Sequence, residues 1–369
     1  MQLDELFKMA AAQKASDLFI REGARPALRI NGKVQQTDLP ALSREEVQAL
    51  AHSVMTERQR EMFSRSSELD LALDIEGVTR VRANFYRQRG GCGMTFRLVP
   101  YRIPTIEELG LPPVLKNLCQ HRQGLILVTG PTGCGKSSTL AAMLDLINNT
   151  KKVHIITVED PIEFVHPDKM GIVTQREVGV DTENFRDALK YMMRQSPDVI
   201  MVGEMRDLET LTVALQASET GHLVLSTLHT SSASETLDRI VNMYAPHEKP
   251  MICERLANTL RGVISQKLVP RIDGSGRVAA CEVMVVTPTV AKMVEEGRFG
   301  NTYAAMVEGE HWGMQTMNMS LLRYLTSGII SAEEALFAAG NQTELRQMMR
   351  QAAETARQAA ESARQQQRG

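Results

Sequence analysis

An apolar run, a glycine-rich turn and an amphipathic segment follow one another between residues 125 and 147. This unit constrains the fold more than any other part of the chain. The run LILVTG (125–130) is typical of a buried strand. The turn GPTGCGKSST (130–139) leads into a segment whose apolar residues recur with a helical period, at Leu140, Met143, Leu144 and Ile147. The unit predicts a strand–loop–helix element of an α/β fold.

The turn fits the pattern G-x-x-x-x-G-K-S/T of phosphate-binding loops in full. Glycines let backbone N–H groups turn toward phosphates, and the N-terminus of the following helix adds partial positive charge. We predict that Lys136 reaches the β- and γ-phosphates of ATP and that Ser137 supplies a hydroxyl to Mg²⁺. The predicted nucleotide-binding residues are Gly130, Pro131, Thr132, Gly133, Cys134, Gly135, Lys136, Ser137 and Ser138.

Three more apolar runs follow, and each closes on an acidic residue or a histidine. They are HIITVED (154–160), DVIMVGE (198–204) and HLVLSTLH (222–229). Strands that alternate with helices predict a mostly parallel sheet with helices on both faces. Because ligands of such sheets bind beyond the carboxyl ends of the strands, we expect the polar residues that follow the runs to share one edge.

Carboxylates at two of these strand ends are candidates for hydrolytic chemistry. Glu159, Asp160 and Glu163 cluster in VEDPIE, and we predict that Glu163 orients the attacking water. Glu204 closes the next run, where a carboxylate suits Mg²⁺ or a metal-bound water. The Gly203 that precedes it is a departure from strands that end directly in Asp.

Two histidines flank the last run. His222 and His229 are seven residues apart with a strand between them, which is not the spacing of zinc ligands. The functional hypothesis is that both sense the γ-phosphate and relay its state to a neighbouring domain. The alternative is that each is an ordinary core or turn residue.

Composition narrows the classes of partner. The 42 Lys and Arg are balanced by 44 Asp and Glu, which argues against a dedicated nucleic-acid binder. Five cysteines without a C-x-x-C pair predict neither a disulfide framework nor a zinc tetrad. No apolar run approaches the ~20 residues that cross a bilayer, and no signal peptide is evident. We expect a cytoplasmic protein that reaches any membrane through partners, without inserting into it.

The ends of the chain follow other patterns. Short alternating apolar runs after a helical segment at residues 3–10 predict a small α+β domain, and four prolines between residues 100 and 113 predict a linker. The near-repeat QAAETAR–QAAESAR (351–364) favours a solvated, partly frayed helix over a coiled coil. The predicted boundaries are 1–98 for the N-terminal domain, 99–115 for the linker, 116–345 for the nucleotide-binding domain and 346–369 for a polar helical or disordered tail.

Several segments in this order resemble the secretion-ATPase superfamily: GPTGCGKSST, VEDPIE, TQREVGVDTENF, DVIMVGEMRD and ETGHLVLSTLHT. Within it the chain is similar to the type IV pilus retraction ATPases, the PilT/PilU group, from SDLFI (16–20) to GMQTMN (313–318). The resemblance implies a PAS-like N-terminal domain, a RecA-like P-loop ATPase domain and a homo-hexamer. It also implies ATP hydrolysis that drives pilus disassembly in twitching motility, through a platform protein of the inner membrane.

The family's functional positions map onto this sequence residue by residue. Its acidic, Walker B and histidine boxes fall on Glu163, Glu204, His222 and His229. Its N-terminal arginines, which stabilise charge on the transferred phosphoryl group, fall on Arg82 and Arg97. Nearby alternatives are Arg80, Arg87 and Arg89.

Some positions depart from the retraction pattern. VAKMVEEG (290–297) stands where retraction ATPases carry an AIRNLIRE-like box, and Phe19 stands where many have histidine. With REVGVDT, these lean toward the PilU-like branch, which assists a paralogous principal motor. Cys134 sits at a variable position that tolerates small residues. A second hypothesis gives its thiol a lowered pKa and sensitivity to oxidation.

Other functions stay open at this point. A pilus-assembly or type II secretion ATPase usually adds an earlier N-terminal domain and a cysteine tetrad. A RecA-like nucleic-acid translocase would need a basic pore, which the balanced charge disfavours. A small-molecule kinase would need an acceptor site and leaves the histidine box unexplained. A non-enzymatic scaffold would need a degraded phosphate site.

Overall fold

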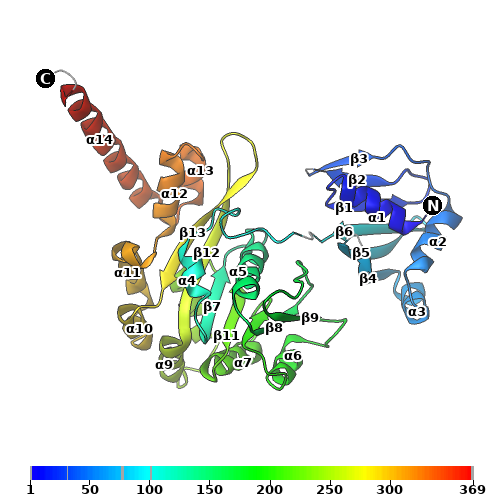
Figure 1. Ribbon diagram of the computed structural model, residues 1–369, viewed down its shortest axis with the longest axis horizontal. Helices are drawn as coiled ribbons and strands as arrows, with labels where there is room; N and C mark the ends of the chain where they lie inside the picture. The colour runs from blue at the N-terminus through cyan, green and yellow to red at the C-terminus, as the bar shows by residue number, and fades with distance from the viewer. Residues whose placement is uncertain (1, 31, 76–78, 100–101, 367–369) are drawn as a thin grey trace. The chain divides into compact units, whose positions relative to one another are not determined.

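A computed structural model of the chain describes residues 2–30, 32–75, 79–99 and 102–366, without the side chains of 74, 79, 356 and 359–366. It divides the chain into two compact units (Figure 1). The first comprises Met1–Arg102 with Glu163–Val165, and the second comprises Ile103–Ile162 with His166–Gly369. Residues 100–101 of the predicted linker and 367–369 of the predicted tail lie outside the described residues.

The first unit is built on an antiparallel sheet of order β3-β2-β1-β6-β5-β4. Its strands are β1 (Asp17–Arg21), β2 (Ala27–Ile30), β3 (Lys33–Gln36), β4 (Glu68–Ile75), β5 (Thr79–Gln88) and β6 (Gly91–Leu98). Its helices are α1 (Leu3–Ala12), α2 (Arg44–Ser53) and α3 (Glu57–Ser66). The predicted N-terminal helix is confirmed. The ring of its Phe7 packs edge-to-face against the ring of Phe96 on β6, with 5.0 Å between the ring centres.

The second unit is built on a sheet of order β13-β12-β7-β11-β10-β8-β9. Its strands are β7 (Gly124–Thr129), β8 (His154–Glu159), β9 (Ile172–Glu177), β10 (Val199–Val202), β11 (Leu223–Leu228), β12 (Leu260–Pro270) and β13 (Arg277–Val285). All neighbours pair in parallel except β12 and β13, which pair antiparallel. The predicted mostly parallel sheet is therefore confirmed, and the four apolar runs form β7, β8, β10 and β11.

Helices cover both faces of this sheet. The helices of the second unit are α4 (Val114–Leu118), α5 (Lys136–Thr150), α6 (Phe185–Met192), α7 (Leu208–Glu219), α8 (Ala233–Asn242), α9 (Lys249–Thr259), α10 (Pro288–Glu295), α11 (Thr302–Glu308), α12 (Met317–Thr326), α13 (Ala332–Ala338) and α14 (Gln342–Gln366). Ile126 and Val128 of β7 pack in one core with α4 and α5, whereas Leu125 and Leu127 pack in the opposite core with α6 to α10. Burial on both faces explains why the strands read as unbroken apolar runs.

The last helix, α14, begins in the second unit and continues through the repeat region (Figure 1). Leu345 is fully buried, and Asn318 of α12 donates to Glu344 at 2.6 Å, so the first turns are anchored. The side chains of residues 353–355 and 357–358 are exposed, which fits the solvated helix that the repeat indicates. Within the described part of the chain, no helix combines the length and the apolar character that a membrane crossing needs.

Candidate nucleotide site

The predicted phosphate loop lies between β7 and α5, at the carboxyl end of a central strand. Three glycines of the loop, Gly130, Gly133 and Gly135, have a positive φ, which other residues rarely adopt. Gly130 has φ +141°, and a Cβ there would lie 2.3 Å from the carbonyl oxygen of Gln266. Gly135, at φ +91°, is the N-cap of α5, and no side-chain hydrogen bond caps this end of the helix. The N–H groups of the first turn of α5 therefore remain available to an anion.

Gln266 contacts the phosphate loop, although the sequence analysis did not predict it as a site residue. It lies on β12, buried, and its Nε2 donates to the carbonyl oxygen of Cys134 at 2.6 Å. Its Oε1 accepts from Thr139 Oγ1 of α5 at 2.8 Å. One amide thus joins the loop, the following helix and a strand more than a hundred residues away. The motif carries no signal for it, because the contact depends on strand order.

Lys136 is linked to the end of another strand. Its Nζ donates to the carbonyl oxygen of Gly130 at 2.8 Å and lies 3.4 Å from His229 Nδ1. His229 Nε2 lies 2.8 Å from Glu204 Oε1. Because an ammonium only donates, the neutral imidazole tautomer that fits this arrangement accepts at Nδ1 and donates from Nε2. The structure therefore gathers Lys136, His229 and Glu204, as the shared edge predicts.

The carboxylate of Glu204 is held on both sides. Its second oxygen, Oε2, pairs with Arg206 Nε at 2.8 Å. Mg²⁺ in nucleotide sites is usually held by one or two side chains together with phosphates and water. The half-buried hydroxyl residue Ser137, in the first turn of α5, fits that requirement. Glu204, whose two oxygens are already engaged, fits contact with a metal-bound water better than direct ligation.

His222 lies at the other end of β11 from His229. Its carbonyl oxygen accepts from the N–H of Gly124, which begins β7, and its Nδ1 lies 3.0 Å from the carbonyl oxygen of Ala217. Seven residue steps at about 3.3 Å each put the two histidines about 23 Å apart. The structure thus separates His222 from the phosphate loop of its own chain, and its part in γ-phosphate sensing stays a prediction.

The acidic segment after β8 divides into buried and exposed carboxylates. Glu159 is buried, and its Oε1 accepts from Thr157 Oγ1 at 2.7 Å. Glu163 is exposed and groups with the first compact unit. Among the described residues, Glu163 forms no hydrogen bond or ion pair with Lys136 or Glu204. Its role as the water-orienting carboxylate therefore stays a prediction.

Arg82 and Arg97 are direct cross-strand partners on β5 and β6. The same row continues to Asp17 on β1 and Arg29 on β2. Asp17, whose side chain is 6% exposed, pairs with the Nε atoms of Arg97 and Arg29, each at 3.1 Å. The Arg97 side chain itself stays 66% exposed. One buried carboxylate therefore orients two arginines, which the linear sequence does not reveal.

Arg87, one of the alternative arginines, lies on the other face of β5. Its guanidinium sits 5.3 Å from the centre of the Phe63 ring of α3. Since side chains alternate along a strand, Arg82 faces away from that helix. The structure thus places Arg87 apart from the row that holds Arg82 and Arg97.

The structure favours the first interpretation of Cys134, a tolerated small residue, and contradicts the hypothesis of a lowered thiol pKa. The side chain is 4% exposed, and burial raises the pKa of its thiol even though the nearby Lys136 charge acts to lower it. A raised pKa leaves less thiolate, which is the reactive form. Cys134 is a small buried residue of the loop, packed against Gly130.

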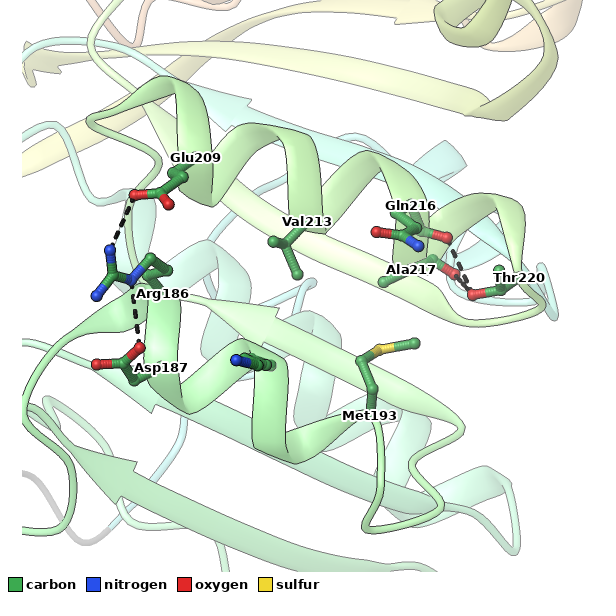
Figure 2. A pocket seen from close by; sticks show the side chains of 9 residues that line it. Arg186, Asp187, Met193, Glu209, Val213, Gln216, Ala217 and Thr220 are labelled. Carbon is green, nitrogen blue, oxygen red and sulfur yellow. Dashed lines mark hydrogen bonds and ion pairs between the residues drawn. The ribbon is translucent and has the colours of Figure 1, made fainter.

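A separate groove lies between α6 and α7 (Figure 2). Met193, Val213 and Ala217 form its apolar part. At one end Arg186 bridges Asp187 and Glu209, at 3.2 and 3.3 Å. None of the predicted site residues lines this groove, so it is distinct from the phosphate loop.

The edge that gathers Lys136, His229 and Glu204 is the edge at which open α/β sheets bind their ligands. A phosphate loop at that edge of a mostly parallel sheet, in a chain that also has a smaller α+β unit, defines a P-loop ATPase with a RecA-like domain and an N-terminal domain. The family model described as type II/IV secretion system protein matches residues 1–368. The chain therefore belongs to that family, and its relatives place it among the pilus retraction ATPases.

Two relatives come from Pseudomonas aeruginosa. The type IV pilus retraction ATPase PilT is 47% identical over 91% of this chain and 97% of its own length. The type IV pilus ATPase PilU is 39% identical over 96% of this chain and 93% of its own length. Identity is higher with PilT, whereas the PilU alignment covers more of this chain. The lean toward the PilU-like branch therefore stays a prediction.

A solved structure supports the same family assignment. A crystal structure of the pilus retraction motor PilT with bound ADP superposes with a TM-score of 0.88, at 44% identity over 94% of this chain and 99% of that one. The fold class predicted from the sequence is confirmed, and so is the nucleotide-dependent class of enzyme.

Proposed function

We propose that this chain is a Mg²⁺-dependent, homo-hexameric ATPase that powers type IV pilus retraction in twitching motility. The observation that carries the proposal is the contact chain from Lys136 through His229 to Glu204, which joins the phosphate loop to a neighbouring strand end. The relatives named as retraction ATPases support the pilus as the object of the work.

The residues have separate tasks in this proposal. Lys136 and the loop N–H groups hold the triphosphate, and Ser137 holds Mg²⁺ together with the phosphates. Bound Mg²⁺ neutralises phosphate charge. Glu163 orients the attacking water, and Glu204 fixes a water of the metal shell. Arg82 and Arg97 stabilise the negative charge on the transferred group.

Coupling to force follows from the division of the site between two domains. Arginines of one domain that complete a site on another are released when the terminal phosphate is lost. The linker at residues 99–115 then acts as the hinge. A closed ring of six chains turns such steps into movement of a central pore. A paralogous motor and a platform protein at the cytoplasmic side of the inner membrane are the proposed partners.

The test compares two lysine variants. Lys136→Ala should abolish ATP turnover by the purified chain, because it removes the cation that binds the phosphates. Lys152→Ala, which changes an exposed lysine just after α5, should leave turnover unchanged. Retained hydrolysis in Lys136→Ala would overturn the site.

Retraction is then measured by pilus imaging in a strain that lacks this chain, with and without its paralogue. Loss of retraction that only the wild-type chain restores supports the motor. Loss confined to the strain lacking both proteins assigns an accessory role. Normal retraction in both strains contradicts the proposal.

A further inference from the structure

The segment TQREVG (174–179) includes the last four residues of β9 (Ile172–Glu177), and neither phosphate binding nor the arginine row accounts for it. Gln175 and Glu177 are two residues apart on this strand, so their side chains share one face of the sheet. They lie opposite Thr157 and Glu159 of β8. The loop that leaves β8 carries Glu163, the proposed water-orienting carboxylate.

Glu177 holds the near end of that loop. Its side chain is buried, and its Oε2 accepts from the N–H of Ile162 at 3.1 Å. The backbone of Glu177 is itself fixed, because its N–H donates to Asp181 Oδ2 at 2.8 Å. Ile162, the residue directly before Glu163, is 3% exposed. A buried carboxylate thus fixes the backbone one residue from Glu163.

Gln175 holds the far end of the loop. Its Oε1 accepts from the N–H of His166 at 2.8 Å. Its Nε2 donates to Glu159 Oε1 at 3.0 Å, which fixes the orientation of the amide. His166 is buried, like Ile162. Only three residues, 163–165, therefore lie between two fixed backbone N–H groups.

We propose that Gln175 and Glu177, the β9 clamp, are positioning residues that set the place of the Glu163 carboxylate. This inference rests on the proposed function, because it takes Glu163 as the group that orients water. The clamp contacts Ile162 and His166 through their backbone N–H groups, and the Glu163 side chain is exposed. It constrains where the carboxylate stands without engaging the oxygens that the chemistry needs.

The first experiment compares two substitutions at Glu177 in the purified full-length chain. Glu177→Ala removes the acceptor and should lower kcat about 10- to 100-fold, with KM for ATP within about twofold, because small displacements of a catalytic group cost that much. Glu177→Gln keeps a carbonyl acceptor and should restore most of kcat. Equal losses in both variants would overturn the acceptor role.

A matched control addresses folding. Asp198 Oδ2 accepts from the N–H of His154 at 2.8 Å, which is a similar bond at the opposite end of β8. Asp198→Ala should leave kcat near that of the wild-type chain. Gln175→Ala offers a second, independent reduction of kcat if Glu177→Ala does not fold. Normal kcat in a folded Gln175→Ala and a folded Glu177→Ala overturns the proposal.

A double variant separates this inference from the proposed function. In the Glu163→Gln background, Glu177→Ala should cause no further loss of kcat, because the group it positions has already been removed. Multiplied losses would mean that Glu177 acts elsewhere. Wild-type turnover in Glu163→Gln alone would overturn the role of Glu163 and the clamp's purpose together. A slow Glu163→Gln beside a fast Glu177→Ala would overturn the clamp alone.

Discussion

The carboxyl edge of the parallel sheet and the open face of the antiparallel sheet both arrange charged side chains, in opposite ways. At the parallel edge, Glu204 lies between His229 and Arg206, and Lys136 lies beside the other nitrogen of the His229 ring. Each group therefore has a complementary neighbour. In the first unit, Arg29 and Arg97 share the single carboxylate of Asp17, with Arg82 beside them.

The difference shows which region has the larger excess of positive charge. The named groups of the parallel edge comprise two cations and one carboxylate, whereas the antiparallel row has three arginines for one carboxylate. A phosphoryl group in transfer gathers negative charge that such cations stabilise. The proposed motor therefore needs both regions, and the predictions below test whether their charges act in one reaction.

The largest expected effect comes from the antiparallel face. Arg97→Ala should lower kcat by 10³- to 10⁵-fold, the range of arginines that stabilise phosphoryl transfer. Arg87→Ala, which changes an arginine on the other face of the same sheet, is the control and should leave kcat unchanged. Steady-state ATP hydrolysis measures both. If the two variants behave alike, the comparison between the regions loses its functional meaning.

The next effect comes from the parallel edge. Glu204→Gln keeps the shape of the side chain but removes its charge, and kcat should fall by about 10²- to 10³-fold, as when one preorganised electrostatic group is lost. Nucleotide affinity, measured by titration with a fluorescent ATP analogue, should change little. The control is Asp207→Asn, which alters the N-cap of α7 and should leave kcat unchanged. A fall in affinity as large as the fall in kcat would contradict a role in the chemical step.

Acid should distinguish the two units in stability. Burial lowers the pKa of His166, in the second unit, to about 4. Between about pH 6.5 and pH 4, the His166 imidazole is therefore protonated in the unfolded chain and neutral in the folded chain. The free energy of unfolding consequently falls as the pH is lowered toward 4. The loss is about 3 kcal/mol.

Urea unfolding at pH 7 and pH 4, followed by the fluorescence of Trp312, reports on the second unit, because Trp312 is the only tryptophan of the chain. His166→Gln should flatten the pH dependence, and His52→Gln, which changes an exposed histidine of the first unit, should not. An unchanged slope in His166→Gln would show that another group titrates.

The smallest effect is expected inside the loop. Cys134→Ser should change kcat by less than about twofold, and mild peroxide should not inhibit the wild-type chain, because a buried thiol with a raised pKa reacts slowly. ATP turnover before and after peroxide measures this. Inhibition that Cys134→Ser prevents would restore a redox role for the loop.

The local pattern predicts much of the fold. The periods of the apolar residues indicate α1, β7 and α5, and the order of strands and helices indicates the parallel sheet. Lys136 and Glu204 follow from motif and strand end. These features depend on residues close together in the chain.

The remaining features depend on which strands become neighbours. Gln266 reaches the loop because β12 lies beside β7, and Asp17 orients Arg97 because β1 lies beside β6. His222 and His229 look equivalent in sequence, yet a strand places them at opposite edges. Gln175 and Glu177 contact a loop only because β9 pairs with β8. No local pattern encodes strand order or register.

The amide of Gln266 has a mechanical consequence. Since it ties the carbonyl of Cys134 to a strand that pairs with β13 from Gly262 to Pro270, the phosphate loop cannot open without disturbing the hairpin behind it. The N–H of Cys134, which donates to the carbonyl oxygen of Pro131 at 3.3 Å, should then exchange with solvent as slowly as the amides of the hairpin, and a loosened hairpin would weaken nucleotide binding from a distance.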